Sequence, residues 1–284
     1  MDLVASGQAQ CVLGNHELNA LVDDETENRP GEGWWYGRND PGYRSVCVDP
    51  LEKDALFRPF LDSLPVALER PDLRVVHACW DEHAIKAVRA FATPMEAFHV
   101  HRRQNRERLK GLRADAREQT RAWDMKDGAT TVPFLRAKAV YDEAYQNDNP
   151  VRVLTSGKER VRAGNSRYLH GKWRMVERVA WWNEQRPWPP VVFGHYWRTY
   201  APPEEKVQYE QDDPFAGTRP DAWLGSGMCV DYSVGRRYQD RRQPGRPTDS
   251  RYGLGALRIP EWTVLFDDER TPLEVGPPIN GAAA

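Results

Sequence analysis

The sequence predicts an α/β protein. Short apolar runs, typical of buried strands, alternate with longer segments in which apolar residues recur at helical spacing. Three of the apolar runs end directly in polar side chains, within residues 12–17, 75–77 and 192–195. Because ligands bind beyond the carboxyl ends of strands in open α/β sheets, we expect these three endings to meet at one site.

The composition narrows the class of protein. The chain has 284 residues and carries 40 Lys and Arg against 42 Asp and Glu, a net charge of -2. This balance gives no bulk electrostatic reason to expect nucleic acid or a membrane surface as a partner. Four cysteines without a CxxC pair fit neither a disulfide scaffold nor a zinc ribbon. The opening residues do not resemble a signal peptide and no apolar run approaches a membrane span, so we expect a cytoplasmic protein.

The N-terminal part predicts a strand, a loop and a helix. Residues 11–13 are apolar and predict a short buried strand, whereas residues 23–50 are acidic and then rich in Gly, Trp and Tyr, as in a surface loop. Asp49 followed by Pro50 is a typical helix start, with an N-cap and a proline at the first helical position. Pro59 lies within the helical pattern that follows and predicts a kink or a restart there.

A hairpin and a helical region come next. Residues 66–68 and 73–79 predict paired strands joined by a turn at 69–72. Residues 81–125 predict helices, and the segment 99–122 holds eight Lys and Arg against three acidic residues. Such a segment can attract phosphates, although it is more often only the solvated face of a helix.

The sequence also predicts loops, a tail and further short strands. We expect an acidic loop at 201–221, a basic loop at 236–251 and a disordered tail at 276–284. The expected strands lie at 151–154, within 175–182, and at 191–193, 228–234, 254–259 and 263–266.

Three polar side chains at the strand endings have the chemistry of metal ligands. His77 and His195 offer imidazole nitrogens and Asn15 offers an amide oxygen, a set that suits a divalent transition metal. A single histidine at a strand end is more often a hydrogen-bonded structural residue. The ordered set of three is the stronger signal.

The order of these motifs resembles a known family. GNHE at 14–17, VVHA at 75–78 and VFGH at 192–195 are similar to motifs of the calcineurin-like metallophosphoesterases, especially the bacterial serine/threonine phosphatases and symmetrical dinucleoside tetraphosphatases. The resemblance extends over about 11–266, and the stretch at 229–235 supports it more weakly.

The resemblance implies a fold and a domain organisation. The family has a four-layer αββα sandwich, which here would occupy residues 1–275, ahead of the tail at 276–284. A helical insert is expected at about 81–150. As a cap, that insert would select substrates; as a scaffold insertion, it would have no such role, and the sequence leaves both open.

The resemblance also assigns roles to residues. It implies that Asn15, His77 and His195 are ligands of the second of two divalent metal ions, which would be Mn, Fe, Zn or Ni. It implies that His16 is the general acid that protonates the leaving oxygen, and that Glu17 orients this neighbourhood. Two such ions activate a water for attack on phosphorus and neutralise the phosphoryl oxygens.

Arg198 is a further candidate. It follows His195 by three residues and its guanidinium is suited to bind a phosphate oxygen. The alternative interpretation is an ordinary surface arginine.

The chain departs from the family pattern at its beginning. The family carries an Asp-x-His strand ending and a GDxxDRG motif ahead of GNHE, and neither is present in the thirteen residues before Gly14. The ligands of the first metal are therefore missing, and so is the strand that carries the first of these motifs. We expect either that the protein starts upstream or that it is a remnant of the family.

These observations predict a metal-dependent phosphoester hydrolase. Its expected substrate is a phosphorylated small molecule, a nucleotide or a phosphoprotein. The alternative is a non-catalytic binding or regulatory module that retains one weak metal site. A third interpretation, nucleic-acid binding through 99–122 and 236–251, is not favoured because the chain is slightly acidic overall.

Overall fold

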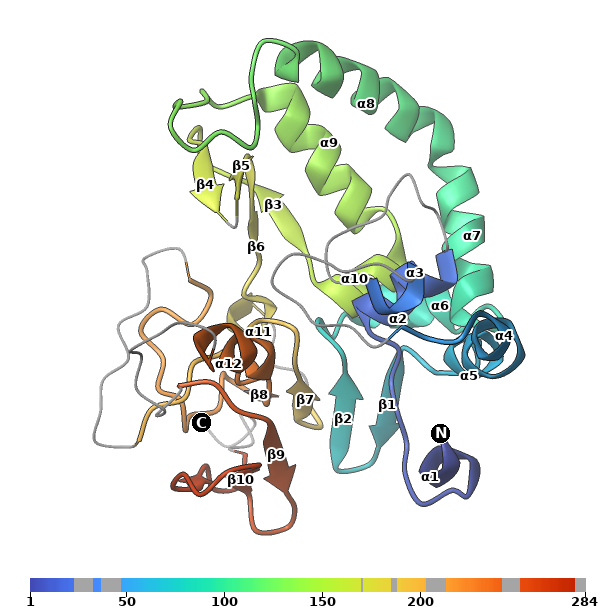
Figure 1. Cartoon of the computed structure of the whole chain (residues 1–284), viewed down its shortest axis with the longest axis vertical. Helices are drawn as coiled ribbons and strands as arrows, with labels where there is room; N and C mark the ends of the chain where they lie inside the picture. Colours follow the sequence, from blue (N-terminus) through green and yellow to red (C-terminus); the bar gives the residue numbers. More distant parts are fainter. Residues whose placement is uncertain are drawn as a thin grey trace. The chain divides into compact units, whose positions relative to one another are not determined.

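The computed structural model describes residues 1–22, 33–36, 47–169, 171–184, 188–202, 213–241 and 251–278. The chain is a mixed α/β protein that divides into two compact units. The first unit comprises residues 1–80 and 180–284, and the second comprises residues 81–179 (Figure 1).

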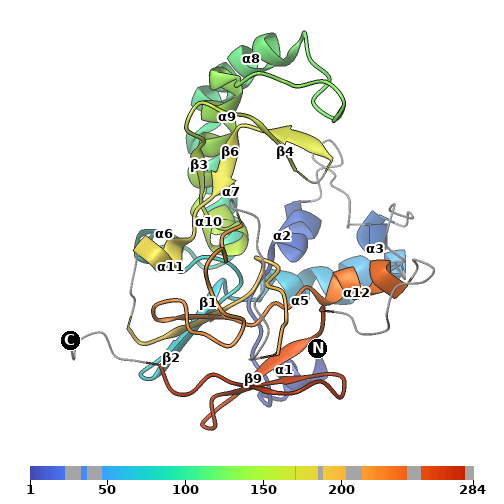
Figure 2. The ribbon, with the colours of Figure 1, turned by 90° about the vertical axis from the view of Figure 1, so that its left-hand side faces the viewer.

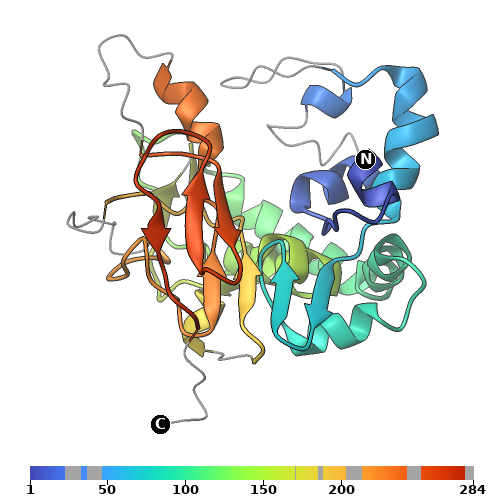
Figure 3. The same cartoon turned by 90° about the horizontal axis from the view of Figure 1, so that it is seen from below.

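A four-stranded sheet forms the centre of the first unit. Its order is β1-β2-β7-β8, with β1 (Ala67–Arg70), β2 (Leu73–Val76), β7 (Val191–Phe193) and β8 (Gly227–Cys229). β1 and β2 form the expected antiparallel hairpin, whereas β2, β7 and β8 are parallel (Figure 3). The parallel pairing brings the carboxyl ends of these three strands to the same edge of the sheet.

A second sheet in the same unit confirms two late strands. β9 (Gly255–Arg258), β10 (Thr263–Phe266) and β11 (Leu273–Glu274) are antiparallel in the order β11-β10-β9. A buried cluster joins this sheet to β8. Its members are Tyr200, Met228, Tyr232, Val264 and Leu273.

Buried aromatic rings support β7 from one side. Trp182 stacks on Phe193 at a centroid distance of 5.0 Å and on Phe215 at 5.4 Å. Trp181 contacts Phe193 edge to face and donates a hydrogen bond from its indole nitrogen to the carbonyl of Ala78, 3.0 Å away. Much of the aromatic content of the sequence is therefore core packing.

The helices of the first unit are short. They are α1 (Asp2–Ala5), α2 (Asn15–Val22), α3 (Gly33–Tyr36), α4 (Pro50–Glu52), the π-helical segment η2 (Lys53–Phe57), α5 (Arg58–Asp62), α11 (Trp181–Glu184) and α12 (Val234–Arg241). The side chain of Asp49 accepts a hydrogen bond from the backbone nitrogen of Leu51 at 2.8 Å, which confirms the predicted N-cap. The kink or restart predicted at Pro59 is not seen as a break, because the chain is helical from Pro50 to Asp62 and the irregularity is the π-helical segment η2 directly before α5.

The second unit contains five helices and two two-stranded sheets within its described residues. The helices are α6 (Glu82–Val88), α7 (Pro94–Gln104), α8 (Arg106–Thr120), α9 (Arg136–Asn147) and α10 (Pro150–Ser156). β3 (Glu159–Val161) pairs with β6 (Val176–Arg178), and β4 (Arg167–Leu169) pairs with β5 (Lys172–Arg174). The compact unit thus covers residues 81–179 and contains strands as well as helices, whereas the helical insert expected from the sequence at about 81–150 stays a prediction.

Two predicted strands are wrong. Residues 151–154 belong to α10, because Asn149 caps the helix by accepting a hydrogen bond from Val151 at 3.1 Å and Pro150 occupies the first helical position. Residues 11–13 lie beside the sheet without strand pairing, and the nitrogen of Leu13 donates a hydrogen bond to the carbonyl of Pro65 at 2.8 Å.

Other predictions are correct only in part. The strand within 175–182 ends at Arg178 and gives way to α11, and the strand expected at 228–234 is confined to β8. α12 occupies the start of the segment expected as a basic loop at 236–251, whereas residues 242–250 lie outside the described part.

The remaining loop predictions fall largely on undescribed residues. Most of 23–50, the middle of 201–221 and residues 279–284 of the tail lie there. Within the described ranges, no helix combines the length and the apolar character that crossing a membrane requires.

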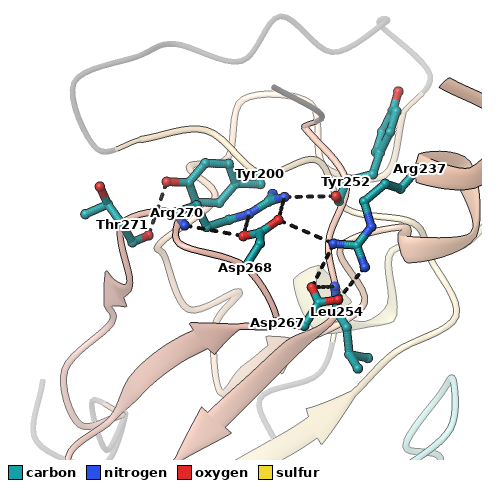
Figure 4. A network of polar contacts seen from close by, with 8 residues as sticks. All are labelled: Tyr200, Arg237, Tyr252, Leu254, Asp267, Asp268, Arg270 and Thr271. Atoms are coloured by element: carbon teal, nitrogen blue, oxygen red, sulfur yellow. Dashed lines mark hydrogen bonds and ion pairs between the residues drawn. The ribbon is translucent and has the colours of Figure 1, made fainter. Parts of the chain in front are cut away.

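A polar network fixes α12 to the second sheet (Figure 4). Asp267, at the end of β10, accepts hydrogen bonds from the guanidinium of Arg237 at 2.9 Å and from the nitrogen of Leu254 at 3.0 Å. Arg270 pairs with Asp268 at 2.6 Å and lies over the ring of Tyr200. The hydrogen bond from Arg237 lowers the pKa of Asp267 to about 2.

This shift predicts how stability depends on pH. Because the pKa of Asp267 is lower in the folded chain than in the unfolded chain, its ion pair stabilises the fold above about pH 4 and is lost as the pH falls through about 2. Asp267→Asn should therefore lower the melting temperature at pH 6, and its difference from wild type should shrink towards zero near pH 2. Thermal unfolding followed by circular dichroism measures this difference. The matched control is Asp72→Asn, in an exposed pair with Arg70, and an Asp267→Asn deficit that stays constant from pH 6 to pH 2 would contradict the assignment.

Candidate metal site

Three side chains from distant parts of the chain meet at one point. The Oδ1 atom of Asn15 lies 3.0 Å from Nε2 of His77 and 3.1 Å from Nδ1 of His195. The two imidazole rings lie edge to face, with centroids 5.4 Å apart. The structure thus brings together the three residues that the sequence predicted as metal ligands.

The local fold explains this meeting. His77 follows β2 and His195 follows β7, and these neighbouring parallel strands end at the same edge. The nitrogen of Gly194 donates a hydrogen bond to the carbonyl of His77 at 2.9 Å, which extends the pairing to the site. Asn15 is the first residue of α2, at the end of the irregular segment that precedes this helix.

Unusual backbone conformations accompany the site. His195, Trp197 and Ser233 have φ values of 71°, 62° and 59°, in the left-handed region that residues with a Cβ rarely adopt. Each such conformation costs on the order of 1–3 kcal/mol and persists only where surrounding contacts enforce it. The turns after β7 and β8 are therefore held by other contacts.

Asp231 supplies those contacts, and the sequence did not identify this role. Its two carboxylate oxygens accept hydrogen bonds from the nitrogen of Ser233 at 2.9 Å and from the nitrogen of Trp197 at 3.3 Å. Its carbonyl accepts a hydrogen bond from the nitrogen of Arg198 at 2.8 Å. Asp231 thus connects the two turns and positions His195. The signal in the sequence was an acidic residue two positions after a buried strand.

His16 of α2 and His77 after β2 differ in exposure. His16 is exposed, whereas His77 is partly buried. Burial, with a smaller contribution from the charge of His16, lowers the pKa of His77 to about 4. His77 is therefore neutral at pH 7, as a metal-ligating imidazole must be.

Glu17 and His77 both lie close to Gly14. A Cβ atom at Gly14 would be 2.5 Å from Oε2 of Glu17 and 2.9 Å from the ring of His77. Glycine at this position therefore leaves room for both side chains, and a larger residue would displace at least one of them. The carboxylate of Glu17 lies on the same side of Gly14 as the imidazole, consistent with the orienting role expected for it.

Arg198 is neither the phosphate-binding arginine nor the surface arginine that the sequence suggested. Its side chain is fully buried, so it is not a surface arginine. Its guanidinium donates hydrogen bonds to the carbonyls of Arg219 and Ala222, the latter at 2.9 Å. These bonds fix the segment after β7 to the 219–222 turn, so the buried guanidinium binds carbonyl oxygens and is not placed to bind a phosphate.

The two separations from Asn15 allow one divalent cation and are also hydrogen-bond distances. Ligands at about 2.1 Å from a metal and at right angles to each other lie about 3 Å apart, which is close to the separations of the Asn15 oxygen from the two histidine nitrogens. Among the described residues, no three His, Cys, Asp or Glu side chains gather in one place. The amide oxygen of Asn15 therefore completes the trio, and all three donors are neutral.

Comparison with known proteins gives no relative. No model of a protein family, no curated protein and no solved structure matches this chain.

Gly14→Ala tests the crowding at the site. The added methyl group must displace Glu17 or His77, so we expect a loss of about 1–3 kcal/mol of unfolding free energy and weaker binding of Mn²⁺. Chemical denaturation and calorimetric titration measure the two effects.

Gly111→Ala is the matched control. A Cβ there meets no atom within 4 Å, and the residue lies within α8, so this change should leave metal binding intact and raise helix stability slightly. If the two variants had the same free energy of unfolding and the same Mn²⁺ affinity, the close approach of Glu17 and His77 to Gly14 would contribute nothing to stability or binding.

Proposed function

We propose that this chain is a metal-dependent phosphoester hydrolase. The observation that carries the proposal is the approach of His77 and His195, 118 residues apart, to the single amide oxygen of Asn15. These residues occupy the positions that the resemblance to metallophosphoesterases assigns to the ligands of one metal. The two sheets of the first unit, joined by a buried cluster, support the further proposal of a four-layer αββα sandwich.

Each residue of the site has a role in this proposal. Asn15, His77 and His195 hold one divalent cation, which supplies positive charge to the phosphoryl oxygens. His16 is exposed at the start of α2 and donates a proton to the leaving oxygen. Glu17 orients this neighbourhood, and Asp231 holds the turn that carries His195.

The proposed metal is Mn, Fe, Zn or Ni, since imidazole and amide ligands suit each of these ions. The family mechanism uses a second cation, which requires ligands beyond this trio. The substrate proposed is a phosphorylated small molecule, a nucleotide or a phosphoprotein. The proposed compartment is the cytoplasm, since four cysteines without a CxxC pair do not have the density of a secreted disulfide scaffold.

A non-catalytic module that binds one metal is the second candidate. The feature that favours it is the neutral donor set, because a site without a carboxylate ligand binds a divalent cation more weakly and offers no bridge to a second ion.

Three variants separate the two candidates. Calorimetric titration with Mn²⁺ should give one site that is lost in His77→Gln and in His195→Gln. Hydrolysis of p-nitrophenyl phosphate should fall about 10²–10⁴-fold in His16→Gln while Mn²⁺ affinity is retained, because the general acid is not a ligand.

His83→Gln is the matched control, since His83 is an exposed histidine of α6 and should change neither measurement. Binding of Mn²⁺ without hydrolysis in the wild type would favour the non-catalytic module. Unchanged Mn²⁺ binding in both ligand variants would contradict the metal site itself.

A further inference from the structure

The near-neutral net charge hides two units of opposite charge. Residues 81–179 contain 21 Lys and Arg against 13 Asp and Glu, a net charge of +8. The first unit contains the other 19 basic and 29 acidic residues, a net charge of -10. The second unit is therefore strongly basic, and 15 of its 21 basic residues are arginines.

Part of this charge forms a stripe along α8. Five basic residues between 106 and 121 recur every three or four positions, so they lie on one face of α8 and its C-cap, whereas Arg108 lies on another face and pairs with Asp148. We call this set the α8 basic stripe; it consists of Arg106, Lys110, Arg113, Arg117 and Arg121, all of them exposed. At a rise of about 1.5 Å per residue the stripe extends over about 22 Å.

The other sides of α8 are different in character. Leu109, Leu112 and Ala116 are less exposed than the residues of the stripe. α8 packs along the neighbouring helix α9 (Figures 1 and 2). The acidic residues of the helix fall at positions outside the stripe. Only two of them come near it, in ion pairs of 3.9 Å from Glu107 to Lys110 and from Glu118 to Arg121. Exposed pairs of this length contribute little and are readily exchanged for another anion.

The chemistry of the stripe favours one kind of partner. No exposed large apolar side chain lies on α7 or α8 in the described structure, so this face has neither the anchors of a membrane-surface helix nor those of a protein interface. Arginine is instead suited to phosphate, since its planar guanidinium binds two oxygens at once. A row of such groups is complementary to a row of backbone phosphates.

We propose that the α8 basic stripe binds the phosphate backbone of a nucleic acid without reading its sequence. This surface belongs to the second unit and shares no residue with the metal site, so the proposal is independent of the hydrolase activity. The expectation from the sequence that nucleic acid is not a partner rested on the net charge of the whole chain, which averages a basic unit with an acidic one.

Fluorescence anisotropy of the full chain with labelled 20-base-pair DNA duplexes tests the proposal. Two duplexes of unrelated sequence should bind with equal affinity at low salt. The triple variant Arg106→Gln, Arg113→Gln, Arg117→Gln should weaken binding at least tenfold. It should also reduce the slope of log K against log salt by about 2–3, because each lost phosphate contact removes about one unit.

The matched control removes three exposed arginines from the first unit, Arg70→Gln, Arg219→Gln and Arg258→Gln, and so changes the net charge equally. It should retain wild-type affinity and slope. Equal loss of binding in both triple variants would attribute binding to bulk charge and overturn the assignment to α8, as would absence of binding by the wild type at low salt. Competition by poly-glutamate as effective as that by unlabelled duplex would also overturn it, because the stripe would then select an acidic polypeptide.

Discussion

The amide oxygen of Asn15, facing one nitrogen of His77 and one of His195, is the contact on which the proposed site depends. It exists because β2 and β7 are parallel neighbours whose ends lie at one edge, and because α2 begins at Asn15 beside that edge. The buried rings of Trp181 and Trp182 pack on Phe193, the last residue of β7, next to this edge. A shift of either strand by one residue would turn its histidine to the other face of the sheet and separate the trio.

The site combines neutral side-chain donors with turns that hydrogen bonds hold in unfavourable backbone conformations. Burial keeps His77 neutral, and Asp231 holds the turns in which His195, Trp197 and Ser233 have positive φ values. Such strain persists only when surrounding contacts outweigh it, so its location beside the trio is consistent with a functional role for these turns. Asp231 therefore contributes through geometry, by holding the backbone of the turn that follows His195.

The sequence predicted the trio because its signals are local: each member sits at the junction of an apolar run and a polar residue. It could not predict Arg198, since burial of a guanidinium depends on carbonyls at 219–222 that only the fold brings near. Residues 151–154 were misassigned because the spacing of apolar residues in so short a run does not distinguish a strand from a helix. The N-cap at Asn149 and the proline at 150 favour the helix that is observed. The net charge of the whole chain did not reveal the basic second unit, because a sum over the chain contains no information on where the charges lie.

The central claim is that Asn15, His77 and His195 hold one divalent cation. Electron spin echo spectroscopy of the full chain with substoichiometric Mn²⁺ tests this claim most directly, because it detects nitrogen nuclei bonded to the ion. The account predicts couplings from two histidine nitrogens, one of which disappears in His77→Gln and the other in His195→Gln. A spectrum without histidine nitrogen, or one that both substitutions leave unchanged, would contradict it.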